Sequence, residues 1–452
     1  MAPPIAYDVA RAFVGCFSVT PRGIDRVDLL YARFLFETWP GDCIGTLPTP
    51  WGVRWYDRRR ALQLLDRAEE LWSETIQPCE DRVLLKIKSR LSGNHAPQFD
   101  KSRKDGQRVN PVSRFFEILS ATGFSFGDSV VRSVPKNSIY VNPGHITLKV
   151  PCLVSWLKHR PDVKSVFMVH DVIPLEYPEF FPKGEYRLHE NLVAQTARYA
   201  SGLIVPTAAA RESVLNALRL CRQVEIAVET APLPVPPIFL EKDRPDEELG
   251  KHDYFVICGA IEPRKNHLLL LNVWRELVRQ RGEHAPRLVV VGSPIWRIAS
   301  LLGELERRCQ PLQGQVIFAR GLSSPALRRL IAHAKALLMP SFAEGFGLPL
   351  IEALAVGTPV IASDLPAHRE SAGDLAVYRD PTDESGWLND ICMFADGNGR
   401  AAEIRRRVSH YQPLTWREYF IRIERFLKTF AQPLSARRPQ VPPPGFSLQK
   451  SA

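Results

Sequence analysis

The sequence lacks several features that would define its class directly. No apolar stretch approaches the roughly 18–20 residues that a membrane-spanning helix requires. The amino terminus, MAPPIAYDVARAF, lacks the basic head and long apolar core of a signal peptide. The eight cysteines are scattered without CxxC or CxxxC spacing, which argues against a disulfide framework and against zinc. We therefore expect a cytoplasmic protein.

Two further absences concern ligands. The sequence shows no short DxD pair of aspartates, so it predicts no metal site. It also shows no aromatic and basic recognition motif, so nucleic acid is not expected as a partner. The formal net charge of +10 and the pI near 9.2 instead suit a membrane surface or an anionic ligand.

The chain is long enough for more than one domain. Its 452 residues and 45% hydrophobic content are ordinary for a globular protein with two or three domains. A proline-rich stretch separates two regions of strand and helix patterns, which indicates a linker. The predicted division is a domain over 1–235, a linker over 236–250, a domain over 251–412, an amphipathic helix over 413–430 and a disordered tail over 431–452.

The most informative segment is SFAEGFGLPLIEALAVGTPVIASD, from 341 to 364. Apolar runs before and after it predict buried parallel strands at 336–339 and 360–362, and the proline of the turn suits the first turn of a helix between them. The loop of such a unit lies at the carboxyl edge of the sheet, where helix amides favour a phosphate. Glu344 and Glu352 are then placed to bracket one diphosphate. The alternative is an ordinary βαβ unit with two surface glutamates.

A second segment favours the functional interpretation. The run from 254 to 258 predicts another buried strand, and it is followed by Gly259 and by Arg264 and Lys265. Two cations at a strand end are what a diphosphate needs, because Arg can donate two parallel bonds and Lys supplies a point charge. Further apolar runs at 288–291 and 316–318, with a helix capped at Ser324, complete a doubly wound pattern.

The first half carries weaker candidates. Gly23 lies in the loop TPRGIDRV before an amphipathic helix and allows close backbone approach. His170 and Asp171 follow a predicted strand at 166–169, and His145 has a similar strand-to-loop context. A single histidine is more often structural than functional, although a position at the carboxyl end of a strand favours a site. Thr207 is expected to cap a helix.

These motifs resemble those of glycosyltransferase family 4, retaining enzymes of the GT-B fold. The Glu, seven residues, Glu signature corresponds to Glu344 and Glu352, and the string EPRKN at 262–266 is also typical. The resemblance implies an α/β protein with two Rossmann-like, doubly wound domains that face a central cleft. It implies that the first domain binds the acceptor and that the helix over 413–430 returns to that domain. Many members carry an arginine where this chain has Gly259.

The resemblance also implies roles for individual residues. Glu344 would hold the transferred sugar, Glu352 the ribose and Lys265 the diphosphate, with Arg264 as a second cation. His170 would orient the sugar or the acceptor. The complete set of expected site residues is Glu344, His170, Lys265 and Arg264 for catalysis, Glu352, Phe346, Gly347, Leu348, Gly23 and Gly259 for the donor, and His145 and Asp171 on the acceptor side.

The implied reaction transfers a hexose without a cofactor or metal. HDVIPLEYPE at 170–179 is similar to bacterial mannosyltransferases of surface polysaccharide synthesis, exopolysaccharide or lipopolysaccharide, which favours GDP-mannose as donor. The acceptor would be a glycan or a polyprenyl-diphosphate-linked oligosaccharide. Two alternatives stay open, namely a nucleotide-sugar epimerase of the same architecture and a noncatalytic GT-B scaffold.

The region over 51–137 departs from regular strand and helix alternation. Basic clusters such as Arg58 to Arg60 alternate there with leucines and a tryptophan, which predicts an insertion. One hypothesis is a solvated helical hairpin with a flexible tip. The other is an interfacial surface that docks on anionic lipid at the inner face of the plasma membrane.

Overall fold

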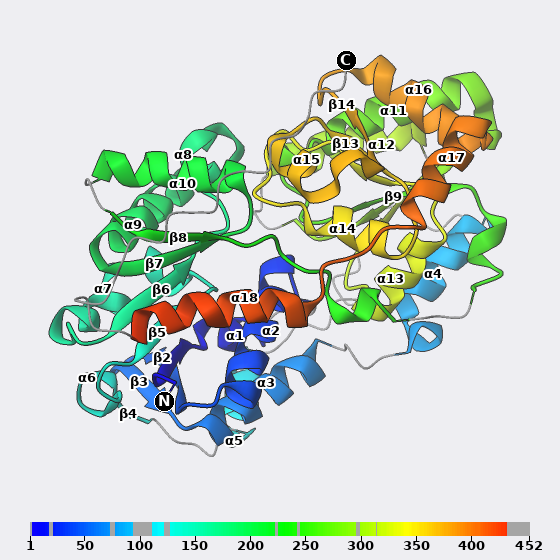
Figure 1. The fold of residues 1–452 in the computed structure, drawn as a ribbon. Coiled ribbons are helices and arrows are strands. Elements are labelled where there is room, and N and C mark those ends of the chain that lie inside the picture. The colour runs from blue at the N-terminus through cyan, green and yellow to red at the C-terminus, as the bar shows by residue number, and fades with distance from the viewer. Residues whose placement is uncertain are drawn as a thin grey trace.

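The protein contains two separate β-sheets, each flanked by helices (Figure 1). The computed structural model describes residues 2–17, 21–72, 77–93, 111–121, 127–221, 225–241, 245–294, 299–312 and 314–431. The predicted disordered tail lies outside these residues except for Ala431. None of the helices within the described ranges is long and apolar enough to cross a membrane.

The first sheet has eight strands and belongs to the amino-terminal half. Six of them pair in parallel and two, β3 and β4, pair antiparallel at one edge. The order across the sheet is β4 (Asp128–Ser129), β3 (Gly52–Tyr56), β2 (Cys43–Thr49), β1 (Ile5–Asp8), β5 (Ile139–Asn142), β6 (Lys164–Met168), β7 (Ala200–Val205) and β8 (Ala227–Thr230).

The second sheet has six strands, all parallel. Its central strands are buried apolar runs, as expected for a sheet covered on both faces. The sequence order reverses between β9 and β12, and in such sheets the ligand binds at the carboxyl ends of the strands at this point. The order is β11 (Val316–Ala319), β10 (Arg287–Val291), β9 (Tyr254–Cys258), β12 (Leu337–Met339), β13 (Val360–Ser363) and β14 (Ala376–Arg379).

Helices connect the strands of both sheets. The α-helices are α1 (Ala10–Gly15), α2 (Gly23–Thr38), α3 (Arg58–Leu71), α4 (Arg82–Leu91), α5 (Pro111–Ala121), α6 (Val130–Ser133), α7 (Pro151–Val154), α8 (Ile173–Glu176), α9 (Lys183–Tyr199), α10 (Ala208–Cys221), α11 (His267–Arg281), α12 (Ala299–Cys309), α13 (Ser324–Ala332), α14 (Leu348–Ala355), α15 (Pro366–Ala372), α16 (Glu384–Asp396), α17 (Gly399–Val408) and α18 (Trp416–Lys428).

One predicted cap is displaced by a residue. The hydroxyl that accepts from the first turn of α13 belongs to Ser323, which bonds the Ala326 amide at 3.4 Å, and not to Ser324. Pro325 suits the first turn, but Ser324 already has helical geometry. Its hydroxyl is therefore available to accept from Arg26 of the first domain, at 2.7 Å.

The last helix packs on the first half of the chain. In Figure 1, α18 runs beside α1 and α2, far from the strands that precede it in sequence. The Phe420 ring stacks on that of Phe34 with centroids 4.0 Å apart, and the hydroxyls of Tyr31 and Tyr419 share a hydrogen bond. The helix buries Tyr419, Ile423 and Leu427 in this way, so it ties the end of the chain to the first domain.

The region over 51–137 is more integrated than a solvated hairpin. Strands β3 and β4 extend the first sheet, and α3 buries Leu64 and Leu65 in the core. Helix α4 instead joins the second half, where Lys88 pairs with Asp246 at 2.7 Å. The leucines of α3 and α4 are largely covered by protein, but Leu85, Trp51, Phe115 and Phe116 of this region are exposed, so the lipid-binding surface stays a prediction. The expected flexible tip falls mostly outside the described residues.

Candidate functional site

Two cations stand beyond the carboxyl end of β9. A single turn of 3₁₀ helix, η7 (Pro263–Lys265), carries Arg264 and Lys265, and Asn266 then adopts left-handed geometry with φ of 54° before α11 begins. Gly259, at the strand end, has φ of 140°, in the region that favours glycine. A Cβ added there would lie 3.6 Å from Lys265 Cε, in ordinary van der Waals contact with this lysine.

Glu344 meets both cations. Its Oε1 pairs with Lys265 Nζ and accepts from Ser341 Oγ at 2.7 Å, and its Oε2 lies 2.9 Å from Arg264 NH1. The other terminal nitrogen of Arg264 lies 2.7 Å from Glu262 Oε1. The two sequence segments that were predicted to share one ligand therefore lie side by side. What each residue does toward a donor stays a prediction.

The electrostatics keep this cluster ionised. Burial alone would raise the pKa of Glu344, but Arg264, Lys265 and His368 outweigh it and hold that pKa well below its usual range. Burial lowers the pKa of Arg264, yet Glu344 and Glu262 raise it overall. Burial raises the pKa of Glu262, although Arg264 and Lys265 oppose this shift. At neutral pH the buried Glu344 is thus an anion matched by two cations.

The turn before α14 exposes a helix amino terminus to the same place. Gly347 precedes the helix with φ of 98°, and within the described part of the chain no side chain caps it. A Cβ on Gly347 would lie 3.1 Å from the His368 ring, which adds a steric reason for glycine. Phe346 is buried and Leu348 is the first helical residue. The uncapped terminus is suited to an anion, as the sequence predicts.

Glu352 lies one turn into α14 and is almost fully buried, with 2% of its side chain exposed. Its Oε1 is 3.3 Å from NH1 of Arg26, which belongs to α2 of the first domain. The amino ends of α2 and α14 also meet, because a Cβ on Gly23 would lie 2.8 Å from Leu348 Cδ1. Glu352 and Gly23, which were both predicted to bind the donor, therefore lie at the contact between the two domains.

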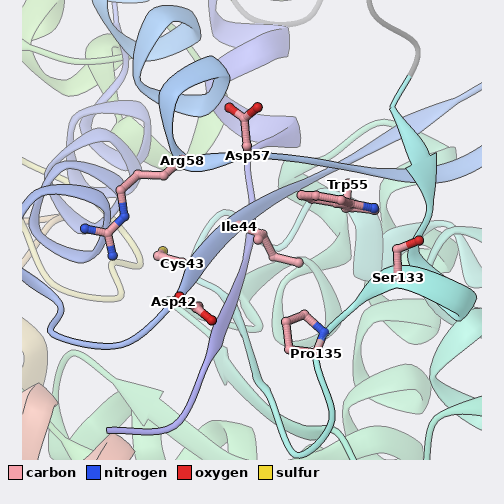
Figure 2. Close-up of a pocket in the computed structure, with 8 residues that line it drawn as sticks. All are labelled: Asp42, Cys43, Ile44, Trp55, Asp57, Arg58, Ser133 and Pro135. Carbon is pink, nitrogen blue, oxygen red and sulfur yellow. The ribbon is translucent and has the colours of Figure 1, made fainter.

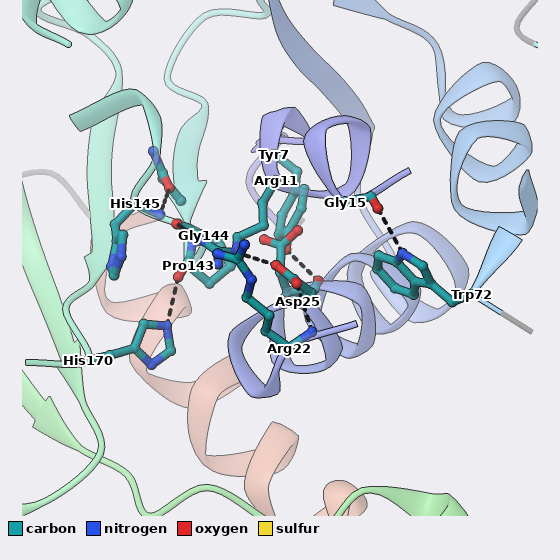
Figure 3. A network of polar contacts seen from close by, with 12 residues as sticks. Tyr7, Arg11, Gly15, Arg22, Asp25, Trp72, Pro143, Gly144, His145 and His170 are labelled. Atoms are coloured by element: carbon teal, nitrogen blue, oxygen red, sulfur yellow. Dashed lines mark hydrogen bonds and ion pairs between the residues drawn. The ribbon is translucent and has the colours of Figure 1, made fainter. Parts of the chain in front are cut away.

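His145 and His170 lie in a buried group of the first domain (Figure 3), whereas Asp171 is only partly buried. The Nε2–H of His170 donates to the Pro143 carbonyl oxygen at 3.0 Å, and its ring lies 5.4 Å from that of His145. Arg11 bonds Asp25 at 2.8 Å and the Gly144 carbonyl at 3.1 Å. Burial lowers the pKa of His170 to about 4, so this ring is neutral at pH 7.

The loop of Glu344 touches the His170 segment. A Cβ on Gly345 would lie 2.5 Å from the His170 carbonyl oxygen and 3.0 Å from the Asp171 Cβ. Thr207 caps α10 as expected, with its Oγ1 accepting from the Ala210 amide at 2.9 Å, and it also donates to the Gly345 carbonyl at 3.0 Å. The predicted residues of the two domains are thus brought to one contact region.

Sequence reasoning missed Arg26, Glu262 and His368 in this region, and it predicted Thr207 only as a helix cap. Arg26, Glu262, Thr207 and His368 all contact predicted site residues or their loops. Glu262 lies inside the EPRKN string, so its signal was present but was assigned to its neighbours. Arg26 lies inside the TPRGIDRV string, where only Gly23 was selected, and His368 carries no local signal, because its contacts depend on how distant helices pack. In the part of the chain that the structure describes, no group of three or more His, Cys, Asp or Glu is placed to hold a metal.

A pocket of about 370 Å³ lies elsewhere on the first domain (Figure 2). It is at the amino end of β2, opposite to the carboxyl ends where ligands bind in this kind of sheet. It contains none of the predicted site residues. Its lining residues are Asp42, Cys43, Ile44, Trp55, Asp57, Arg58, Ser133 and Pro135.

Comparison with solved structures identifies the class of fold. The fold is that of the GT-B glycosyltransferases. HepE from Anabaena, solved in complex with UDP-glucose, superposes with a TM-score of 0.56 at 16% identity over 95% of this chain and 97% of that one. The predicted fold class, two Rossmann-like domains, is therefore confirmed.

The family comparison is more specific for the second domain. Residues 252–396 match the model of the family Glycosyl transferases group 1, which confirms the predicted resemblance. The chain is 30% identical over 233 residues to the serotype-specific mannosyltransferase WbdA of Escherichia coli, covering 47% of this chain and 28% of that protein. It is 28% identical over 230 residues to the O-antigen chain mannosyltransferase RfbU of Salmonella typhimurium, covering 49% of this chain and 58% of that protein. The chain thus spans less than a third of WbdA.

Proposed function

We propose that the protein is a retaining glycosyltransferase that transfers a hexose from a nucleotide diphosphate sugar to a hydroxyl of a glycan or lipid-linked oligosaccharide. One observation carries this proposal, namely that Lys265 and Arg264 lie against the Glu344 loop at the uncapped end of α14. Positive charge and helix amides at one place suit a leaving group that gains negative charge.

The site residues take the following roles in the proposal. Lys265, Arg264 and the amides of α14 stabilise the departing diphosphate, so the chemistry uses charges that are fixed before the reaction. Glu344 holds hydroxyls of the sugar and Glu352 those of the ribose. The acceptor hydroxyl attacks from the face that the diphosphate leaves, with a phosphate oxygen as base. His170, which is neutral at pH 7, orients the sugar or the acceptor.

Mannose is the favoured sugar and GDP-mannose the favoured donor. The names of the relatives WbdA and RfbU support this choice. We place the activity in synthesis of a surface polysaccharide, at the cytoplasmic face of the membrane and without a metal cofactor. The acceptor is then a growing glycan, free or carried on polyprenyl diphosphate.

A panel of nucleotide sugars tested by thermal shift examines the donor. A true donor binds the folded state and stabilises it by mass action, about 2.7 kcal/mol at 100 times Kd. We expect GDP-mannose to raise the melting temperature most, and NMR of the transfer product to show retention at the anomeric carbon. Failure of every nucleotide sugar to shift the transition would refute the proposal. Conversion of the donor without any acceptor would instead indicate an epimerase.

A further inference from the structure

Arg26 is placed to serve the donor from the opposite domain. It is the fourth residue of α2, in the first domain, and its side chain is only 15% exposed. Its NH1 lies 3.3 Å from Glu352 Oε1 and its NH2 donates to Ser324 Oγ at 2.7 Å. Both partners belong to helices of the second domain, so this guanidinium bridges the two domains next to the expected ribose position.

The Arg26 side chain has a donor that the protein does not use. Its Nε is buried and has no hydrogen-bond partner among the residues that the structure describes. Most buried polar groups are partnered, so an exception calls for an explanation such as a ligand. A guanidinium presents five N–H donors in one plane, an arrangement that matches two oxygens of a phosphate.

The end of β9 lies beside the Lys265 side chain. Gly259 brings no side chain there, and a Cβ at this position would be 3.6 Å from Lys265 Cε. Glu352, Arg26 and Lys265 all act on the neighbouring Cys258 thiol. Burial and Glu352 raise the pKa of this thiol to about 12, and the two cations oppose the shift. Lys265 belongs to the turn that follows β9 and Arg26 belongs to α2, so the two cations come from different domains.

The backbone at this point adds positive character. Gly23 begins α2, a helix of 16 residues, and its close approach to Leu348 puts the amino ends of α2 and α14 together. Helix amino termini carry partial positive charge. An anion held here would thus face the amino end of α14, Lys265 and Arg26, whereas Asp25 already accepts from the Arg22 amide at the start of α2. Glu352 supplies the negative charge for Arg26 in the ligand-free protein.

We propose that Arg26 is a diphosphate ligand that the first domain contributes to the donor site. This rests on the proposed function. When the donor binds, the ribose hydroxyls take over Glu352, and the released guanidinium turns to the phosphate oxygens. Because Lys265 and Arg26 come from different domains, the diphosphate holds the two domains together.

Calorimetric titration of a nucleotide series tests this role. GDP, UDP and dTDP are first compared with wild-type protein, and the base of the tightest binder is chosen. The probes are then the nucleoside, the monophosphate and the diphosphate of that base. Loss of a charge-assisted hydrogen bond lowers affinity by roughly 10- to 150-fold. We expect Arg26→Gln to lose this much for the diphosphate and less than about threefold for the nucleoside. Arg26→Lys should recover part of the loss, because a point charge remains.

The controls separate the possible failures. Arg59→Gln removes an exposed arginine of α3 and should leave all three affinities unchanged. Equal losses for nucleoside and diphosphate would show that Arg26 only positions Glu352, and unchanged diphosphate affinity in a folded variant would also overturn the inference. Wild-type protein that binds no nucleotide would instead refute the proposed function. If Arg26→Gln does not fold, Arg26→Lys decides by the same comparison of nucleoside and diphosphate.

Discussion

Replacing Lys265 by methionine separates the diphosphate role of this residue from its structural one. In the ligand-free protein its ammonium pairs with Glu344, whose side chain is 7% exposed. Methionine has similar length and can fill the same space without the charge. Glu344 keeps Arg264 at 2.9 Å and Ser341 at 2.7 Å, so the carboxylate is not left alone.

These contacts set the expected magnitudes. Removing the only partner of a buried charge costs about 3–5 kcal/mol. Because two partners of Glu344 remain, we expect Lys265→Met to lower the free energy of unfolding by only about 1–3 kcal/mol. A charge-assisted hydrogen bond to the diphosphate contributes about 1.5–3 kcal/mol. The dissociation constant for nucleoside diphosphate should therefore rise by roughly 10- to 150-fold.

Isothermal titration at fixed salt measures the affinity, and urea unfolding measures the stability. Lys251→Met removes an exposed lysine of the same half of the chain and is the matched control, for which neither quantity should change. A folded Lys265→Met protein with a dissociation constant within about twofold of wild type would remove Lys265 from the donor site. It would also refute the reasoning that this cluster binds a diphosphate.

Three further variants test other parts of the structure. Glu344→Gln should abolish transfer yet bind nucleoside diphosphate about fivefold more tightly, because Arg264 and Lys265 lose their competing carboxylate; weaker binding by calorimetry would contradict this. Lowering the pH from about 6.5 to about 4 should lower the free energy of unfolding by up to about 3 kcal/mol through His170, because this histidine binds a proton in the unfolded state and stays neutral in the folded state. A His170→Asn protein whose unfolding has the same pH dependence as wild type would disprove this prediction. Lys88→Met should lower stability by about 1–3 kcal/mol, because Asp246 is buried beside it, without changing nucleotide affinity; a change in affinity would show that α4 contributes to the site.

The elements of the second domain were predictable because they depend on local sequence. The strand at 254–258 agrees with β9 at both ends, and the strands predicted at 336–339 and 360–362 each differ from β12 and β13 by one residue. Fully buried parallel strands are continuous apolar runs with glycines and prolines at their ends, so their limits can be predicted from the sequence alone. The position of Glu344 and Lys265 at neighbouring strand ends follows from the same topology.

Contacts between distant elements were not predictable in this way. Arg26 and Glu352 are 326 positions apart, and nothing in the periodicity of either helix selects the other. Helix α4 gives a similar case. Its apolar stripe predicts that one face is buried, but an amphipathic face is equally compatible with lipid and with protein. The partner is decided by tertiary packing, through Lys88 with Asp246 and through the Asp81 carboxylate, which accepts from the Ser323 amide at 3.0 Å.

The charges of the candidate site are balanced before any donor arrives. Glu344 is matched by Lys265 and Arg264, and Glu352 is matched by Arg26. A nucleotide sugar brings two phosphates for the cations and hydroxyls for the carboxylates, so its binding exchanges partners and adds little net charge pairing. The affinity for the donor then depends on the difference in free energy between the ion pairs of the ligand-free protein and the contacts made in the complex. For this reason, removing the Glu344 carboxylate and removing the Lys265 ammonium should change diphosphate affinity in opposite directions, although both variants lose transfer.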